Sequence, residues 1–195
     1  MSSPDPGNAR SAAAEPFPHL DAAGNARMVD VGAKQVSARE AVATGRVLVA
    51  PHVVAALRDG TLPKGDALAV ARIAGIMGAK RTPDLVPLCH PIGLTGVDLD
   101  VRVDEDAVSI RAATRTADRT GVEMEALTAV TVAALAVVDM VKGLDPGAVI
   151  TDVAVQRKTG GRRGTWTRSA SPGGGDGGPD GEDGPDGPDG PDGAS

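Results

Sequence analysis

Residues 120–142, with the sequence TGVEMEALTAVTVAALAVVDMVK, form the longest helix-like run in the chain, and the other elements are arranged around it. At about 100° per residue, one stripe of such a helix carries Glu125, Thr128, Val132, Leu135, Asp139 and Lys142. The other faces are mostly Ala, Val, Leu and Met, and a helix that is apolar nearly all round is a buried helix. The stretch therefore predicts a core helix bracketed by Gly121 and Gly143.

The ionisable residues of this helix are Glu123, Glu125, Asp139 and Lys142, and we expect them to be at least partly buried. Buried charges must be paired, be neutralised or contact a ligand. Asp139 and Lys142 are three positions apart, so they are neighbours on one face and predict an ion pair. The alternative is an ordinary core helix in which this pair is only structural.

The two ends of the predicted helix are far apart. Glu125 and Lys142 are 17 positions apart, which is roughly 25 Å at the rise of an α-helix. No nucleotide-sized ligand contacts both ends of one such helix. Either one end is functional, or the two ends serve separate subsites, as they would if neighbouring subunits contributed opposite ends to one pocket.

The composition indicates one domain with tails, because the chain has 195 residues of which 41% are hydrophobic. Aromatic residues are nearly absent, with one Trp, one Phe and no Tyr, which argues against stacking platforms for single-stranded nucleic acid. The lone cysteine, Cys89, excludes an intrachain disulfide and a multi-thiolate metal site. We expect a disordered tail at 1–16, a domain at 17–166 and a disordered acidic tail at 167–195.

The net charge of −6 comes from the C-terminal tail. Residues 171–195 hold seven acidic and no basic residues, so the rest of the chain has 20 basic and 19 acidic residues and no electrostatic footprint for DNA or RNA. The N-terminus lacks the apolar region of a signal peptide, and the apolar region 126–138 is too short to span a bilayer. A cytoplasmic protein without a nucleic-acid or membrane partner is expected.

The order of predicted elements indicates an α+β fold. The patterns predict strands at 46–50, 97–103, 108–113 and 149–157 and helices at 52–58 and 64–81, while 37–44 is ambiguous between helix and strand. This order is that of the ferredoxin-like (βαββαβ) arrangement, an antiparallel sheet with helices on one face. The other face needs cover, which often comes from another subunit, so we expect an oligomer.

Two loops combine unusual residues. Lys64 lies at the start of the helix predicted at 64–81, for which Asp66 is the N-cap. A cation there is unfavourable for the helix dipole unless it meets a phosphate or carboxylate. The alternative is a solvated loop lysine.

Cys89 and His90 lie between Pro87 and Pro91. A histidine can move protons at neutral pH, and the pair alone is not a metal site. The alternative is a buried, hydrogen-bonded His in a rigid loop.

The ends of the core helix are two further candidates. Glu123 and Glu125 near its N-terminus have a plain explanation in the helix dipole, but carboxylates also suit the N–H groups of a guanine-like ring. At the other end, Lys142 beside Asp139 can serve as a general acid while Asp139 orients it or takes a proton.

Four motifs together, LPKGD (62–66), ARIAGIMGAKRTPDLVPLCHPI (71–92), TGVEMEALTA (120–129) and DMVK (139–142), strongly resemble the cyclic pyranopterin monophosphate synthase family, also called molybdenum cofactor biosynthesis protein C. The similarity runs from about residue 19 to residue 164. The resemblance implies conversion of 3′,8-cyclo-7,8-dihydro-GTP to cyclic pyranopterin monophosphate with release of pyrophosphate. It also implies a ferredoxin-like fold and a hexamer, a trimer of dimers, with sites at subunit interfaces.

The resemblance also implies roles for individual residues. The family's catalytic Asp matches Asp139, and its two essential lysines match Lys64 and Lys142. The substrate-binding positions match Leu88, Cys89, His90, Met124 and Glu125, with Glu123 beside them and Lys158 suited to phosphate. Our hypothesis is that Asp139, Lys142, Lys64 and His90 share the proton transfers by general acid/base catalysis.

No flavin motif or iron–sulfur cysteine set is present, so the sequence predicts a reaction without a required cofactor. Mg²⁺ is compatible with the triphosphate, although no carboxylate cluster specifies a metal site. The alternative function is a non-catalytic ferredoxin-like nucleotide-sensing module. Such a module would keep a phosphate-binding lysine but would have no need of Asp139 beside Lys142.

Overall fold

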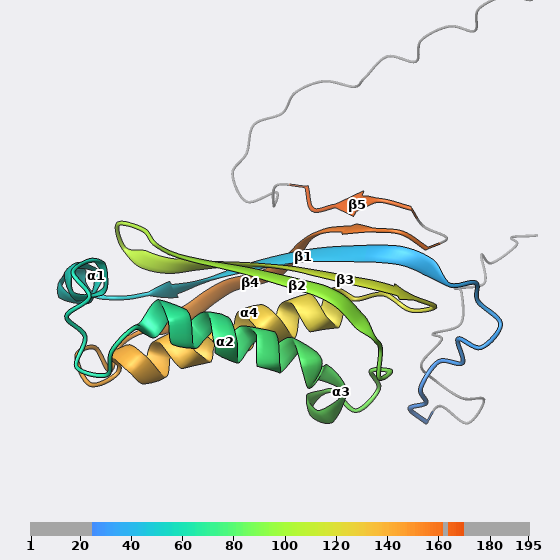
Figure 1. The fold of residues 1–195 in the computed structure, drawn as a ribbon, viewed down its shortest axis with the longest axis horizontal. Helices are drawn as coiled ribbons and strands as arrows, with labels where there is room; N and C mark the ends of the chain where they lie inside the picture. Colours follow the sequence, from blue (N-terminus) through green and yellow to red (C-terminus); the bar gives the residue numbers. More distant parts are fainter. Residues whose placement is uncertain (1–24, 162–163, 170–195) are drawn as a thin grey trace, which may run out of the picture.

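The computed structural model describes residues 25–161 and 164–169, and in these ranges the chain forms one five-stranded antiparallel sheet. The strands are β1 Ser37–Leu48, β2 Leu94–Val103, β3 Ala107–Asp118, β4 Val149–Thr159 and β5 Trp166–Thr167, in the order β2-β3-β1-β4-β5. The helices are α1 Pro51–Arg58, α2 Ala67–Lys80, α3 Thr82–Leu85 and α4 Glu123–Val141. The long helices α2 and α4 lie side by side on one face of the sheet (Figure 1).

This topology confirms the predicted α+β, ferredoxin-like fold. The ambiguous residues 37–44 belong to the same strand as the predicted 46–50, because β1 runs through both. The predicted hairpin is also confirmed, since β2 and β3 pair from Val103 and Val108 outward. However, β3 continues to Asp118, well beyond the predicted end at residue 113.

The helix predicted at 64–81 begins later than expected, at Ala67. Gly65 has a φ of 89°, a left-handed conformation that turns the chain before the helix can start. Asp66 then caps the helix as predicted, because its Oδ1 accepts a hydrogen bond from the Ala69 N–H at 2.9 Å. Lys64 therefore lies in the turn before α2 and not within its first helical turn.

The core lies between the sheet and the helix pair, and α4 is at its centre. This helix packs against α2, β1, β3 and β4, and its fully buried alanines are Ala126, Ala129, Ala133 and Ala134. The glycines of α2 permit the close approach, because a Cβ on Gly75 would lie only 2.7 Å from the Ala129 carbonyl oxygen. Among the described residues, α4 alone has the length and apolarity of a membrane span, and this packing accounts for its composition.

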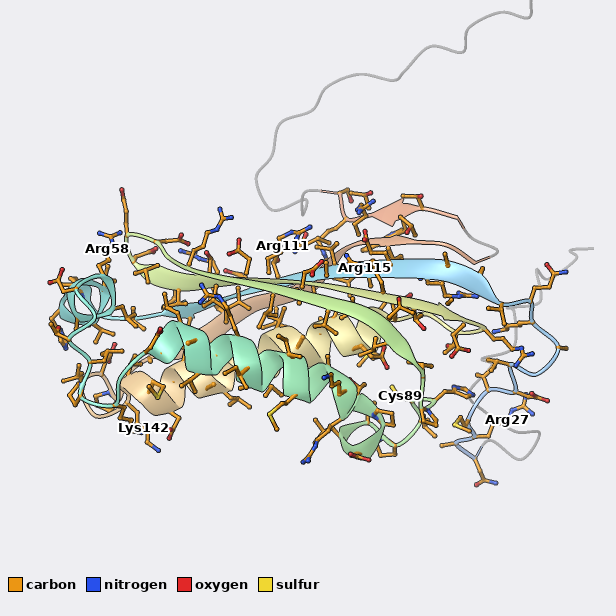
Figure 2. All side chains as sticks on the ribbon, viewed as in Figure 1. Arg27, Arg58, Cys89, Arg111, Arg115 and Lys142 are labelled. Carbon is orange, nitrogen blue, oxygen red and sulfur yellow. The ribbon has the colours of Figure 1, made fainter. Side chains whose placement is uncertain are left out.

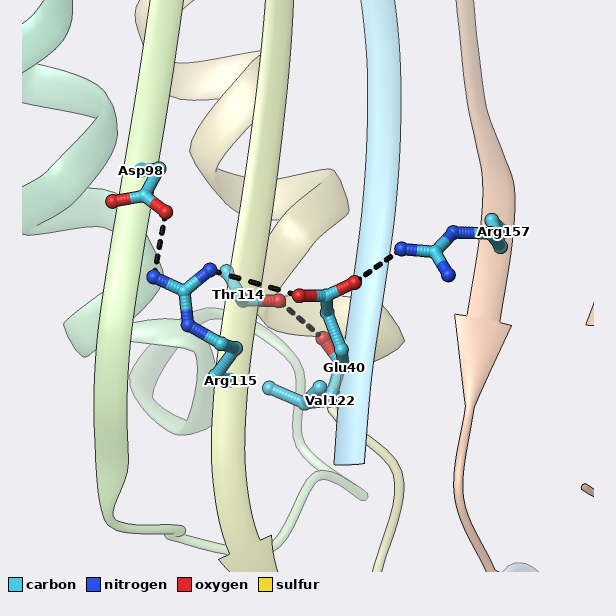
Figure 3. A network of polar contacts seen from close by, with 6 residues as sticks. All are labelled: Glu40, Asp98, Thr114, Arg115, Val122 and Arg157. Carbon is cyan, nitrogen blue, oxygen red and sulfur yellow. Dashed lines mark hydrogen bonds and ion pairs between the residues drawn. The ribbon is translucent and has the colours of Figure 1, made fainter. Parts of the chain in front are cut away.

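The opposite face of the sheet is polar, as the alternation in β2 and β3 predicts. At one end, an ion-pair network crosses four strands (Figure 3). Arg115 on β3 contacts Asp98 on β2 at 2.6 Å and Glu40 on β1 at 3.6 Å, and Glu40 contacts Arg157 on β4 at 2.5 Å. Because these side chains are between 26% and 66% exposed, the network fixes side-chain geometry more than it stabilises the fold.

The expected tails fall mostly outside the described residues: all of 1–16 does, and so do 170–195 of the C-terminal tail. The short strand β5 crosses the expected domain end at residue 166. It pairs with β4 through Trp166 and Thr167, and the Arg168 guanidinium lies 5.7 Å from the centre of the Trp166 ring. Trp166 is 42% exposed.

Candidate functional site

The predicted site residues gather into two groups at opposite ends of α4. We call Lys64, Asp139 and Lys142 the C-terminal cluster, and Cys89, Glu123, Glu125 and Lys158 the N-terminal cluster. Figure 2 shows Lys142 and Cys89 at opposite ends of the helical layer. Glu125 and Asp139 are 14 positions apart on the helix, or about 21 Å along its axis.

In the C-terminal cluster, two ammonium groups contact one carboxylate. Lys142 Nζ lies 2.7 Å from Asp139 Oδ1, which confirms the predicted ion pair. Lys64 Nζ, from the turn before α2, donates to Asp139 Oδ2 at 3.0 Å and to the Asp139 backbone carbonyl. The turn set by Gly65 and the end of α4 therefore bring together residues 75 positions apart.

The expectation that Asp139 and Lys142 are partly buried is wrong for the isolated subunit. Their side chains are 59% and 60% exposed, and that of Lys64 is 44% exposed. The reason is that the buried side of the last turns of α4 is formed by Val137, Met140 and Val141. The stripe that begins at the buried Glu125 has turned toward the surface by this point.

The C-terminal cluster is suited to proton transfer and phosphate binding. The hydrogen bond from Lys142, followed by that from Lys64, holds the pKa of Asp139 below its ordinary value of 3.8. Asp139 is therefore ionised at neutral pH and can accept a proton, whereas the two ammonium groups can donate protons or contact phosphate oxygens.

In the N-terminal cluster, Glu125 is only 3% exposed. Its Oε2 has no hydrogen-bond partner among the described residues. Burial, with a smaller contribution from Glu123, raises the pKa of Glu125 to about 7. A buried carboxyl oxygen without a partner is costly, so this atom is suited to a ligand that offers a hydrogen-bonding edge.

Glu123 and Lys158 form the polar border of this cluster. Lys158 Nζ, from β4, donates to Glu123 Oε1 at 2.7 Å. A Cβ on Gly121 would overlap the Glu123 carboxylate, so the glycine leaves room for this side chain to fold back over the chain before α4. The pair places the cation of Lys158 beside Glu123, in the first turn of α4.

The segment between α3 and β2 supplies Leu88, Cys89 and His90. Burial, followed by the charge of Glu125, raises the pKa of the Cys89 thiol above its ordinary value of 9.0. Leu88 and Met124 are 38% and 39% exposed, so both offer apolar surface. His90 is half-buried and adjoins Cys89, so one subunit does not bring it to Asp139.

Thr114 and Thr116 are two buried threonines of β3 that the sequence patterns do not single out. They hydrogen-bond the segments of the N-terminal cluster. The signal was present in the alternation that places Ile110 and Ala112 on the inner face, because it continues through both threonines. Their polarity obscured it, and the predicted strand ended at residue 113.

The sequence pattern of the MoaC family matches residues 28–161, a range that contains both clusters. Cyclic pyranopterin monophosphate synthase from Streptomyces coelicolor is 71% identical over 151 residues, which cover 77% of this chain and 89% of that relative. The synthase from Nocardioides sp. is 61% identical over 153 residues, covering 77% and 94%. That from Heliobacterium modesticaldum is 54% identical over 156 residues, covering 79% and 98%.

Proposed function

Because this chain belongs to the MoaC family, we propose that it converts 3′,8-cyclo-7,8-dihydro-GTP to cyclic pyranopterin monophosphate and releases pyrophosphate. The reaction is a lyase step of molybdenum cofactor biosynthesis. The nucleotide-sensing alternative is not favoured, because the similar proteins are named as synthases and the residues of both clusters lie within the matched region.

The observation that carries this proposal is the convergence of Lys64 and Lys142 on Asp139. Rearrangement of the substrate needs a base and an acid, and departure of pyrophosphate needs cations near the phosphates. The ionised carboxylate of Asp139 supplies the base, and the two ammonium groups beside it supply the acid and the cations. A module that only binds nucleotides has no use for the carboxylate.

The roles follow from the surroundings of each group. We assign Asp139 as the base, Lys142 and Lys64 as acids that also neutralise developing phosphate charge, and His90 as a further proton carrier. At the N-terminal cluster, Glu125 and Glu123 bind the N–H edge of the purine-derived ring, with Leu88, Cys89 and Met124 against it. Lys158 is assigned to a phosphate oxygen.

The site assignment requires two subunits, because the clusters lie about 21 Å apart along one helix. The apolar residues Val70, Ile73 and Met77 of α2 and Leu135 of α4 are 43–61% exposed on the helical layer. Such a patch is typical of an interface. A twofold axis perpendicular to the helices would bring the N-terminal cluster of one copy toward the C-terminal cluster of the other.

We therefore propose a hexamer built as a trimer of dimers, with sites at the dimer interface, acting in the cytoplasm. The chain is proposed to hold no cofactor of its own. No three His, Cys, Asp or Glu side chains in the described part of the chain are placed to hold a metal ion. Mg²⁺ is proposed only as a companion of the substrate triphosphate.

The test is pyrophosphate release from enzymatically generated 3′,8-cyclo-7,8-dihydro-GTP. We expect rapid release by the wild type and loss of at least a hundredfold in Asp139→Asn and Lys64→Ala, because each removes one of the charges that converge at the C-terminal cluster. Asp100→Asn is the matched control, since Asp100 is a surface carboxylate paired with Arg102 on the other face of the sheet. If the wild type bound the nucleotide without releasing pyrophosphate, the result would contradict the synthase activity and favour the nucleotide-sensing module.

A further inference from the structure

Strand β3 contacts both segments of the N-terminal cluster through two buried hydroxyl groups. Thr114 is fully buried and Thr116 is 3% exposed. They are two positions apart, so both side chains point to the helical side of the sheet. Each hydroxyl donates to a backbone carbonyl outside the sheet, and the two carbonyls belong to different segments.

Thr114 holds the start of α4. Its Oγ1 donates to the Val122 carbonyl at 2.9 Å (Figure 3), and Val122 is the residue immediately before the helix, with no side-chain cap of its own. The Val122 side chain is 1% exposed, so this contact is shielded from water. The position of Val122 sets where Glu123 and Glu125 lie, because both belong to the first turn that follows.

Thr116 holds the end of the Cys89–His90 segment. Its Oγ1 donates to the Gly93 carbonyl at 2.7 Å. Gly93 directly precedes β2, and the pairing of β2 with β3 is irregular between Leu94 and Gly96. The pairing of β2 with β3 alone therefore fixes the start of β2 poorly. The Thr116 hydroxyl supplies a defined contact at that point.

The strand that carries the threonines is paired with β1 on one side and with β2 on the other at this position. Arg115, between them in sequence, points to the other face and is the centre of the network with Asp98 and Glu40. Arg39 on β1 donates to the carbonyls of Asp118 and Arg119, in the connection from β3 to α4. The sheet thus fixes the position of the two threonines. Their hydrogen bonds in turn fix the segments of the N-terminal cluster relative to the sheet.

We propose that Thr114 and Thr116 are positioning residues that set the distance between the Cys89–His90 segment and the first turn of α4. Neither needs to contact the substrate. Each acts through a backbone carbonyl, and together they fix the Cys89–His90 segment relative to the turn of α4 that carries Glu125. The proposal rests on the proposed function for the identity of the ligand, but not for the geometry that it explains.

The lone cysteine makes this geometry measurable without turnover. The rate of alkylation of Cys89 by iodoacetamide follows its thiolate fraction, and that fraction depends on the burial of the thiol and on the nearby Glu125. We would measure the rate against pH for the wild type, Thr114→Val and Thr116→Val, with circular dichroism melting to verify that each variant is folded. Valine keeps the branched shape of threonine and replaces its hydroxyl with a methyl group.

We expect both valine variants to shift the pH midpoint of alkylation downward, because the thiol becomes more hydrated and moves away from Glu125. A shift of one pH unit raises the rate about tenfold at pH values below both midpoints. Thr114→Ser and Thr116→Ser should keep the wild-type profile, because they retain the hydroxyl. In turnover, KM for the nucleotide should rise several-fold in the valine variants.

Thr82→Val is the matched control. Thr82 is also fully buried and donates its hydroxyl to a backbone carbonyl, that of Ala79 at 3.1 Å, but this bond joins α2 to α3. Wild-type alkylation profiles in folded Thr114→Val and Thr116→Val would overturn the proposal. An equal shift in Thr82→Val would also overturn it, because any lost buried hydroxyl would then have the same effect. Absence of turnover in the wild type would refute the proposed function and leave the alkylation result intact.

Discussion

At the scale of single residues, the surroundings of two carboxylates on one helix shift their pKa values in opposite directions. Asp139 is exposed and contacts two ammonium groups, which lower its pKa. Glu125 is buried, and its pKa is raised to about 7. Pairs of acids separated in this way commonly divide the work of an active site. Here the ionised Asp139 is suited to accept a proton, and Glu125 can be present in either form when it meets a ligand.

The raised pKa of Glu125 predicts a pH-dependent stability. The folded chain binds the Glu125 proton more tightly than the unfolded chain does, because the ordinary pKa of this carboxyl is 4.5. The contribution of Glu125 to stability is therefore complete below pH 4.5 and is lost as the pH rises through 7, with a total change of up to about 3 kcal/mol. Relative to wild type, Glu125→Gln should gain free energy of unfolding as the pH rises from 5 to 8.

Urea unfolding at several pH values, followed at one protein concentration, measures this difference. Glu105→Gln is the control, because Glu105 is exposed in the turn between β2 and β3. Parallel stability–pH curves for wild type and Glu125→Gln would show that Glu125 titrates as an ordinary surface acid does.

At the scale of elements, the glycines of α2 set the spacing between the two long helices. Gly75→Ala gains about 1 kcal/mol in helix propensity. Its new methyl group, however, would lie 2.5 Å from Leu99 Cδ2 and 2.7 Å from the Ala129 carbonyl oxygen. Overpacking of this kind costs typically 1–3 kcal/mol, and a backbone atom cannot move aside as a side chain can.

We therefore expect Gly75→Ala to lower the free energy of unfolding by about 1–2 kcal/mol, measured by urea denaturation. Gly143→Ala is the control, because a Cβ at Gly143 would meet nothing within 4 Å. Its effect should stay within about 0.5 kcal/mol. If Gly75→Ala were as stable as wild type, α2 and α4 would have to be able to separate at little cost.

Most elements could be predicted from sequence because their periodicity is strong. The alternation along β2 and the apolar circumference of α4 each indicate one type of structure. Boundaries were harder where polar residues are buried, as at Thr114 and Thr116, or where a turn precedes a cap, as at Gly65 and Asp66. These depend on contacts with other segments, which periodicity does not record.

In the candidate site, too, some contacts follow from sequence spacing and others do not. The pairing of Asp139 with Lys142 follows from helical spacing, and the structure confirms it. The contact of Lys64 with Asp139 does not follow from spacing, since 75 positions separate them; only the family resemblance placed both in one site. Their exposure could not be predicted, because a helical pattern does not show where the cover over a helix ends.

At the scale of the whole molecule, the separation of the two clusters predicts complementation between subunits. Asp139→Asn and Glu125→Gln should each be inactive, but co-expression of the two should restore about a quarter of wild-type activity. Random pairing gives half of the dimers as mixed dimers, and each mixed dimer has one intact site of two. Pyrophosphate release from the purified mixture measures this recovery.

Co-expression of Asp139→Asn with Lys142→Ala is the control, because both changes affect the C-terminal cluster and no pairing yields an intact site. Mixed assemblies that are verified by mass and yet remain inactive in the first combination would mean that each subunit has a complete site. The 21 Å separation along α4 would then have to be spanned within one chain.

The edge strand β5 has an optical consequence. It carries the only tryptophan of a chain that has no tyrosine, and it joins the sheet through two residues. Intrinsic fluorescence therefore originates from a half-exposed indole at the rim, while the alanine- and valine-rich interior emits nothing. An emission-based melting curve would trace the detachment of β5 from β4, and a signal from the peptide backbone is needed to observe the loss of α4.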